Sequence, residues 1–92
     1  MPVYHIEYHP RTKSQLEIIP KKVRGQIFER VEKLSKDPRP IGVEPLHGAD
    51  EGFFRVRQGD YRIVYSIEDH KLLILIVRVV DRKEVYKKKH SK

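Results

Sequence analysis

Three strand-like segments follow one another in the second half of the chain, separated by only two residues each. They cover residues 53–57, 60–68 and 71–80, and the separating pairs are Gln58 with Gly59 and Asp69 with His70. Connections this short allow only hairpins, so the segments predict an antiparallel meander. The last segment is apolar at nearly every position, which is typical of a central strand covered on both faces.

The first half of the chain supplies elements that can cover such a sheet. Residues 3–8 alternate in the manner of a half-buried strand, with Tyr4, Ile6 and Tyr8 on one face. A short helix is expected over 11–19. A second helix should begin at Pro20 and end near Asp37, because its apolar residues recur at helical spacing: Val23, Ile27, Phe28, Val31 and Leu34.

The element order predicts the fold class. Residues 37–52 are rich in proline and glycine, which indicates an irregular connection between the helices and the meander. We therefore predict an α+β domain over residues 1–92, ordered β-α-α-β-β-β. Its two helices should pack on an antiparallel sheet of about four strands.

Composition excludes several kinds of protein. The 92 residues include no cysteine, which excludes disulfide scaffolds and cysteine nucleophiles. The sequence has no glycine-rich phosphate-binding loop and no serine in a nucleophile elbow. The longest apolar run, 72–80, is interrupted by Arg78 and is far too short to span a bilayer. The start of the chain lacks the apolar centre of a signal peptide, so a cytoplasmic location is expected.

The net charge of +7 is concentrated at the C-terminus, where residues 82–92 hold six basic residues against one glutamate. A basic segment on a folded body predicts a polyanionic partner, because each neutralised phosphate releases counterions. The alternative interpretation is a solvated, lysine-rich terminus without a partner.

A cluster of arginines is expected on one face of the meander. Arg55 and Arg57 lie two residues apart on one strand and therefore share a face. A two-residue turn at Gln58 and Gly59 would place Arg55 opposite Arg62 and would match the apolar faces of both strands. Like charges placed opposite each other cost about 0.2–1 kcal/mol. The cluster therefore predicts an anion site, since guanidinium groups bind phosphate bidentately. The alternative is a solvated sheet face.

Three segments of the sequence together resemble a known group of toxins. They are EPLHG (44–48), GFFRVRQGDYRIVYSI (52–67) and DRKEVYK (81–87). Taken together they resemble the RelE/ParE superfamily of bacterial and archaeal toxins, and more closely its RelE branch. The resemblance implies a ribosome-dependent mRNA endoribonuclease that needs no metal or cofactor and is neutralised by a cognate antitoxin.

The resemblance also implies which residues act. The family's pair of basic catalytic residues matches Arg55 and Arg57, and its arginine in the next strand matches Arg62. Its C-terminal arginine and tyrosine match Arg82 and Tyr86. The implied chemistry is attack of the ribose 2′-oxygen on the adjacent phosphate, which gives a 2′,3′-cyclic phosphate and a free 5′-hydroxyl.

The general base must be sought elsewhere, because arginine does not lose its proton near neutral pH. Part of the family uses a glutamate in an EPL-containing loop, and Glu44 matches it. Pro45 restricts Glu44 to an extended backbone, but neighbouring arginines would lower its pKa and weaken it as a base. Glu44 is therefore either the base or part of the loop surface, and His47 is the alternative base.

Two other functions remain open from the sequence. The ParE branch shares the fold and inhibits DNA gyrase without nuclease chemistry. A merely basic, inactive RNA-binding domain would suit the length and the charge equally well. The joint presence of Arg62, Arg82 and Tyr86 favours the nuclease branch.

Overall fold

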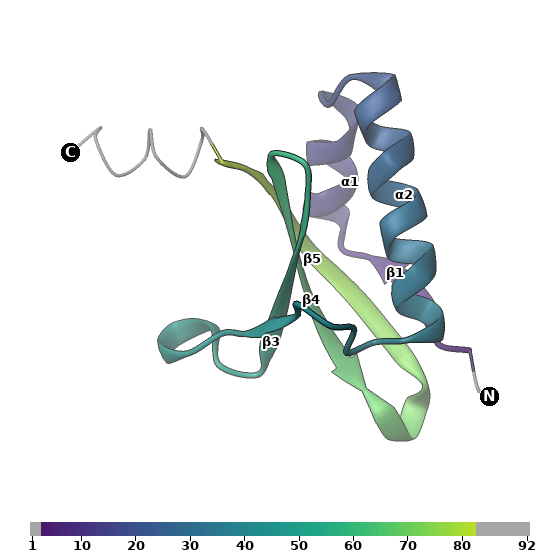
Figure 1. The fold of residues 1–92 in the computed structure, drawn as a ribbon, viewed down its shortest axis with the longest axis vertical. Coiled ribbons are helices and arrows are strands. Elements are labelled where there is room, and N and C mark those ends of the chain that lie inside the picture. Colours follow the sequence, from purple (N-terminus) through teal and green to yellow (C-terminus); the bar gives the residue numbers. More distant parts are fainter. Residues whose placement is uncertain (1–2, 83–92) are drawn as a thin grey trace.

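A computed structural model describes residues 3–82 and confirms the α+β fold class (Figure 1). Two helices lie against one face of a sheet. The elements in chain order are β1 (His5–Tyr8), α1 (Pro10–Glu17), α2 (Lys21–Lys36), β2 (Glu44–Pro45), the 3-10 turn η1 (Gly48–Asp50), β3 (Phe53–Gln58), β4 (Tyr61–Glu68), the 3-10 turn η2 (Asp69–Lys71) and β5 (Leu73–Asp81).

The sheet has five strands in the order β1-β5-β4-β3-β2, and β3, β4 and β5 form the predicted antiparallel meander. It is mixed rather than wholly antiparallel, because β1 runs parallel to β5, with Ile6 opposite Ile74. Hairpins fix the direction of the meander strands, but the two helices after β1 leave its direction open. The fifth strand, β2, lies inside the connection that was expected to be irregular. Its Pro45 is tolerated because β2 is an edge strand.

The β3–β4 turn differs from the sequence prediction. Gln58 is the last residue of β3 and pairs with Tyr61, so the two turn residues are Gly59 and Asp60. Gly59 has φ +59°. A positive φ at the first central residue is what a type II′ hairpin turn requires, and glycine adopts it without strain.

The register of the hairpin therefore shifts by two residues. The predicted pairing of Arg55 with Arg62 is wrong: Arg57 lies opposite Arg62, and Arg55 lies opposite Val64. A shift of two leaves every side chain on its predicted face, because side chains alternate with a period of two. Arg55, Arg57 and Arg62 therefore still share one face of the sheet, which we call the arginine face. The directly opposed pair is Arg57 and Arg62.

The core lies between the helices and the sheet. Helix α2 contributes Ile27, Val31 and Leu34 as the periodicity predicts, whereas Phe28 remains 42% exposed and meets Tyr8 edge-on. The strands contribute the rest of the fully buried apolar side chains, namely Val56, Ile63, Tyr65, Ile74 and Ile76. No helix in residues 3–82 has the length and apolar character needed to cross a membrane.

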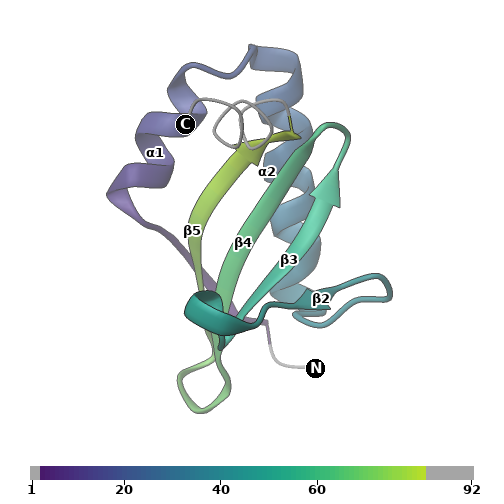
Figure 2. The same ribbon diagram turned by 90° about the vertical axis from the view of Figure 1, so that its left-hand side faces the viewer.

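The second face of the sheet is largely open, so β5 is not covered on both faces as its sequence suggested. Figure 2 shows the helices behind the sheet and η1 in front of it. Leu73 and Leu75, which alternate with the buried side chains of β5, are only partly buried. A β-bulge at Val77, opposite Val64 and Tyr65, then changes the alternation of β5, so that Val79 faces the core and Arg78 faces the open side.

Candidate nucleic-acid interface

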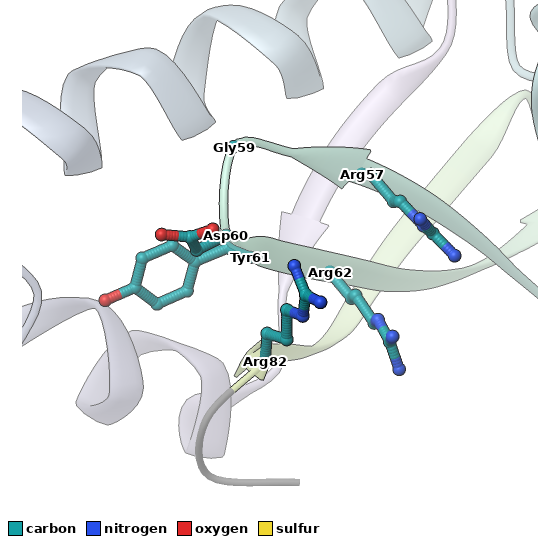
Figure 3. Close-up of a pocket in the computed structure, with 6 residues that line it drawn as sticks. All are labelled: Arg57, Gly59, Asp60, Tyr61, Arg62 and Arg82. Atoms are coloured by element: carbon teal, nitrogen blue, oxygen red, sulfur yellow. The ribbon is translucent and has the colours of Figure 1, made fainter. Parts of the chain in front are cut away.

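Three arginines line an open hollow of about 240 Å³ at the turn between β3 and β4. They are Arg57 from β3, Arg62 from β4 and Arg82 from the residue after β5, and we call this site the arginine pocket (Figure 3). The rest of the lining comes from the turn and the start of β4: Gly59, Asp60 and Tyr61. In Figure 3 the side chains of Asp60 and Tyr61 extend away from the three guanidinium groups.

Strand pairing brings these arginines together from separate parts of the sequence. Arg57 and Arg62 lie directly opposite each other on β3 and β4. The end of β5 runs beside the start of β4, and the backbone N–H of Arg82 donates a hydrogen bond of 2.9 Å to the carbonyl oxygen of Asp60. The hairpin turn therefore fixes the backbone position of Arg82.

The guanidinium groups of the arginine pocket have no acidic partner in the described part of the chain. Arg57, Arg62 and Arg82 form no ion pair with any carboxylate of residues 3–82, although Asp60 lines the same hollow. Three positive charges around one hollow attract anions, and each guanidinium can bind a phosphate through two N–H groups. The geometry suits a phosphodiester backbone.

Arg55 lies on the same face but is already paired. β2 places Glu44 opposite Arg55, and one carboxylate oxygen, Oε1, accepts hydrogen bonds from Nε at 3.0 Å and Nη2 at 2.6 Å. These bonds are the main reason that the pKa of Glu44 lies below its ordinary value, and the charges of Arg57 and Arg62 lower that pKa further. Glu44 is therefore an ionised carboxylate in the field of the arginine pocket.

Arg78 extends the arginine face onto β5 and was not among the predicted site residues. Its Nη2 lies 3.3 Å from Oδ2 of Asp50 in η1, so the pair holds η1 against the open face. The sequence signal was the single charge in an apolar run. The face to which the Arg78 side chain points could not be predicted from the sequence, because it depends on the β-bulge.

Two further residues were predicted for the site from the sequence, Tyr86 and, as the alternative base, His47. His47 is exposed directly before η1, on the same connection as Glu44. Tyr86 lies outside the described residues. Residues 3–82 hold no group of three or more histidine, aspartate or glutamate side chains arranged to bind a metal ion.

Comparison with known proteins identifies the class. The family described as the ParE toxin of type II toxin–antitoxin systems matches residues 6–86. Toxin RelE of Mycobacterium tuberculosis is 31% identical over 85 residues, which are 91% of this chain and 87% of that protein. The mRNA interferase toxin RelE of Escherichia coli is 26% identical over 86 residues, 90% of each chain.

A solved structure agrees with the sequence relatives. The fold is similar to a chain of the RelBE2 toxin–antitoxin complex from Mycobacterium tuberculosis, with a TM-score of 0.82 and 28% identity, covering 89% of this chain and 94% of that chain. The chain belongs to the RelE/ParE superfamily of toxins of type II toxin–antitoxin systems, as the sequence motifs predicted.

Proposed function

We propose that this toxin is a ribosome-dependent mRNA endoribonuclease of the cytoplasm, neutralised by a cognate antitoxin. The observation that carries the proposal is the arginine pocket, in which Arg57, Arg62 and Arg82 surround one hollow without a carboxylate partner among residues 3–82. Support for the activity comes from the Escherichia coli relative, which is named an mRNA interferase. Support for the antitoxin comes from the complex that the fold resembles.

The reaction needs only groups that hold the RNA and move protons. The ribose 2′-oxygen loses a proton and attacks the adjacent phosphorus, the bond from phosphorus to the 5′-oxygen breaks, and that oxygen takes up a proton. The products are a 2′,3′-cyclic phosphate and a 5′-hydroxyl. The protein must therefore align the nucleotide, stabilise the phosphorane charge and provide an acid and a base.

The arginines meet the first two demands. Arg57, Arg62 and Arg82 hold the scissile phosphate and stabilise the charge that develops on it. Arg55, two residues from Arg57 on the same face, positions the neighbouring backbone. Tyr86 stacks on a base or orients a phosphate, as aromatic side chains commonly do with single-stranded RNA.

Glu44 is the proposed general base. It is 48% exposed, it is ionised, and it lies on the same face as the arginine pocket. The hydrogen bonds from Arg55 that lower its pKa weaken it in the free protein. His47, exposed on the same connection, is the alternative base.

A second candidate function is supported by the family match. The matching family is described by its ParE members, so the chain is alternatively a ParE-type toxin that binds DNA gyrase without nuclease chemistry. This alternative gives the arginine face a role in protein recognition instead of RNA cleavage.

A translation extract programmed with a defined mRNA separates these functions. The proposal predicts fragments cut within the reading frame, only when ribosomes are present, with 2′,3′-cyclic phosphate ends. The gyrase alternative predicts intact mRNA and inhibited supercoiling by purified gyrase. A basic RNA-binding domain would bind the mRNA and do neither.

A further inference from the structure

Arg55 differs from the arginines of the pocket because an anion of the same chain already occupies it. Oε1 of Glu44 accepts hydrogen bonds from both Nε and Nη2 of Arg55. These two N–H groups form one edge of the guanidinium fork, and the same edge binds phosphate oxygens bidentately. A carboxylate and a phosphate therefore compete for the same donors.

We propose that Glu44 is a built-in competitor of the RNA backbone, and that a phosphate of bound RNA displaces its carboxylate from Arg55. Displacement adds Arg55 to the three arginines of the pocket as a fourth phosphate-binding residue. The inference rests on the proposed function, since it takes RNA as the ligand of this face.

The contact has the properties of an exchangeable pair. The side chain of Glu44 is 48% exposed, so it can turn into solvent, while the incoming phosphate pairs the charge of Arg55, which is 24% exposed. Glu44 belongs to a two-residue edge strand, whereas Arg55 lies on β3, which is paired on both sides. With Arg55 24% and Glu44 48% exposed, water reaches the pair and keeps its net stabilisation modest. The arginine therefore stays in place and the carboxylate moves.

The position of Arg55 suits a second phosphate of the same strand. Arg55 and Arg57 are two residues apart on one face of β3, which separates their Cα atoms by about 7 Å. This is the scale of the spacing between successive phosphates in an extended single strand of RNA. A strand anchored in the arginine pocket would therefore present its next phosphate to Arg55.

Displacement also changes Glu44 itself. The hydrogen bonds from Arg55 are the largest cause of its lowered pKa, so their loss would raise that pKa towards its ordinary value. The carboxylate would then be a stronger base with RNA bound than in the free protein. The pair thus links occupation of the site to the strength of the proposed base.

RNA binding by the purified protein tests the competition without requiring cleavage. The probe is a single-stranded RNA oligonucleotide with 2′-O-methyl groups, which cannot be cleaved, followed by fluorescence anisotropy. Glu44→Gln should bind it about 3- to 10-fold more tightly than the parent protein, because the competitor for Arg55 is removed. Glu51→Gln is the matched control. It removes the same charge from the same connection, at an exposed glutamate without an ion pair in the described structure.

A second comparison shows whether the gain acts through Arg55. In an Arg55→Ala background, Glu44→Gln should change affinity no more than Glu51→Gln does. Arg55→Lys keeps the charge but loses the two-donor edge of the guanidinium. In this background Glu44→Gln should give only part of its increase in RNA affinity. Arg55→Lys replaces Arg55→Ala if the alanine variant does not fold. The parent exchanges a carboxylate for a phosphate, so Glu44→Gln should also steepen the slope of log affinity against log salt by about 0.7.

Three results would overturn the inference: equal affinities of Glu44→Gln and Glu51→Gln, an undiminished gain without Arg55, or no RNA binding by any variant. The proposed function fails separately. Intact mRNA in a translation extract, together with the expected coupling between Glu44 and Arg55, would reject the nuclease and leave the displaceable pair standing.

Discussion

Arginines lie near both ends of β4, and the two ends differ in whether the guanidinium donors are already paired within the fold. At its start, the arginine pocket gathers Arg57, Arg62 and Arg82 around a hollow without a carboxylate partner in residues 3–82. At its end, Arg39 donates to both carboxylate oxygens of Asp69 in η2, at 3.2 and 3.0 Å. The first arrangement leaves donors for a ligand, whereas the second uses them within the fold.

The second arrangement is a cluster of four side chains that joins distant segments. Besides Arg39, Asp69 accepts a hydrogen bond of 2.6 Å from the hydroxyl of Tyr4, and the guanidinium of Arg39 lies 5.5 Å from the centre of the Phe54 ring. We call these residues the Arg39 cluster. It ties the chain after α2 to β3, to η2 and to the residue preceding β1. The contrast separates an arginine whose donors are used within the fold from arginines whose donors remain available for a ligand.

Arg55 is paired with Glu44 but lies beside the arginine pocket, so this pair falls between the two arrangements. Substitution of Glu44 is expected to have the largest effect on cleavage. Glu44→Gln keeps the shape of the side chain but should slow the chemical step by about 10²- to 10⁴-fold, the usual share of a general base. Single-turnover cleavage on ribosomes measures this rate, with Glu51→Gln as the control. The parent rate should also rise with pH through a carboxylate titration.

Cleavage by Glu44→Gln at the parental rate would show that Glu44 is not the base and that its contact with Arg55 is structural, like that of Asp69 with Arg39. His47 would then be the remaining candidate base. A loss of cleavage in His47→Ala would support it, and parental cleavage in that variant would favour catalysis by arginine electrostatics and positioning alone.

The partner of the toxin should also distinguish the two ends. Acidic side chains of the cognate antitoxin are expected to face the arginine pocket, so Arg57→Glu should weaken the complex by about tenfold, and salt should weaken the parent complex. Arg39→Glu should leave the affinity nearly unchanged. Calorimetric titration at two salt concentrations measures both. A complex that is indifferent to salt and to Arg57→Glu would show that the antitoxin recognises apolar surface instead.

Removal of Arg39 should affect stability alone. Arg39→Ala loses a bidentate ion pair and a contact with an aromatic ring, and the melting temperature should fall by about 2–6 °C. Lys36→Ala, at an exposed lysine at the end of α2 without an ion pair in the described residues, is the matched control. A change in the cleavage rate of Arg39→Ala would break the division between the two ends.

The smallest expected effect is a pH-dependent change in the melting temperature when Asp69 is substituted. The hydrogen bonds from Arg39, and then from Tyr4, lower the pKa of Asp69. A carboxylate whose pKa is lower in the folded state stabilises the protein above its unfolded pKa, near 3.9, and loses this contribution as the pH falls through the folded value. Asp69→Asn should therefore melt about 1–4 °C below the parent at pH 7, with the difference vanishing at strongly acid pH. A difference independent of pH would contradict the assignment.

The fold was predictable from the sequence where local pattern decides. Helical spacing located α2, because its buried side chains must lie on one face. The short connections defined the meander. The direction of β1 depends on how the chain returns after two helices, and β2 is two residues long, so neither leaves a local pattern.

The site was predictable where strand alternation decides, and not where turn geometry decides. The face of Arg57 and Arg62 followed from a period of two, but their direct opposition depends on the turn falling at Gly59 and Asp60. The orientation of Arg78 depends on a β-bulge. The Arg39 cluster was missed entirely, because Arg39 and Asp69 are 30 residues apart and only the packed fold brings them together.

The central claim is that the arginine pocket carries activity and not stability, and Arg62→Ala tests it most directly. Cleavage of a defined mRNA in a translation extract and the melting temperature should be measured on the same preparation. We predict a loss of cleavage of about 10²- to 10³-fold, as for removal of one group that stabilises transition-state charge. The melting temperature should stay within about 2 °C of the parent. Parental cleavage by folded Arg62→Ala, or loss of the fold in that variant, would contradict the claim.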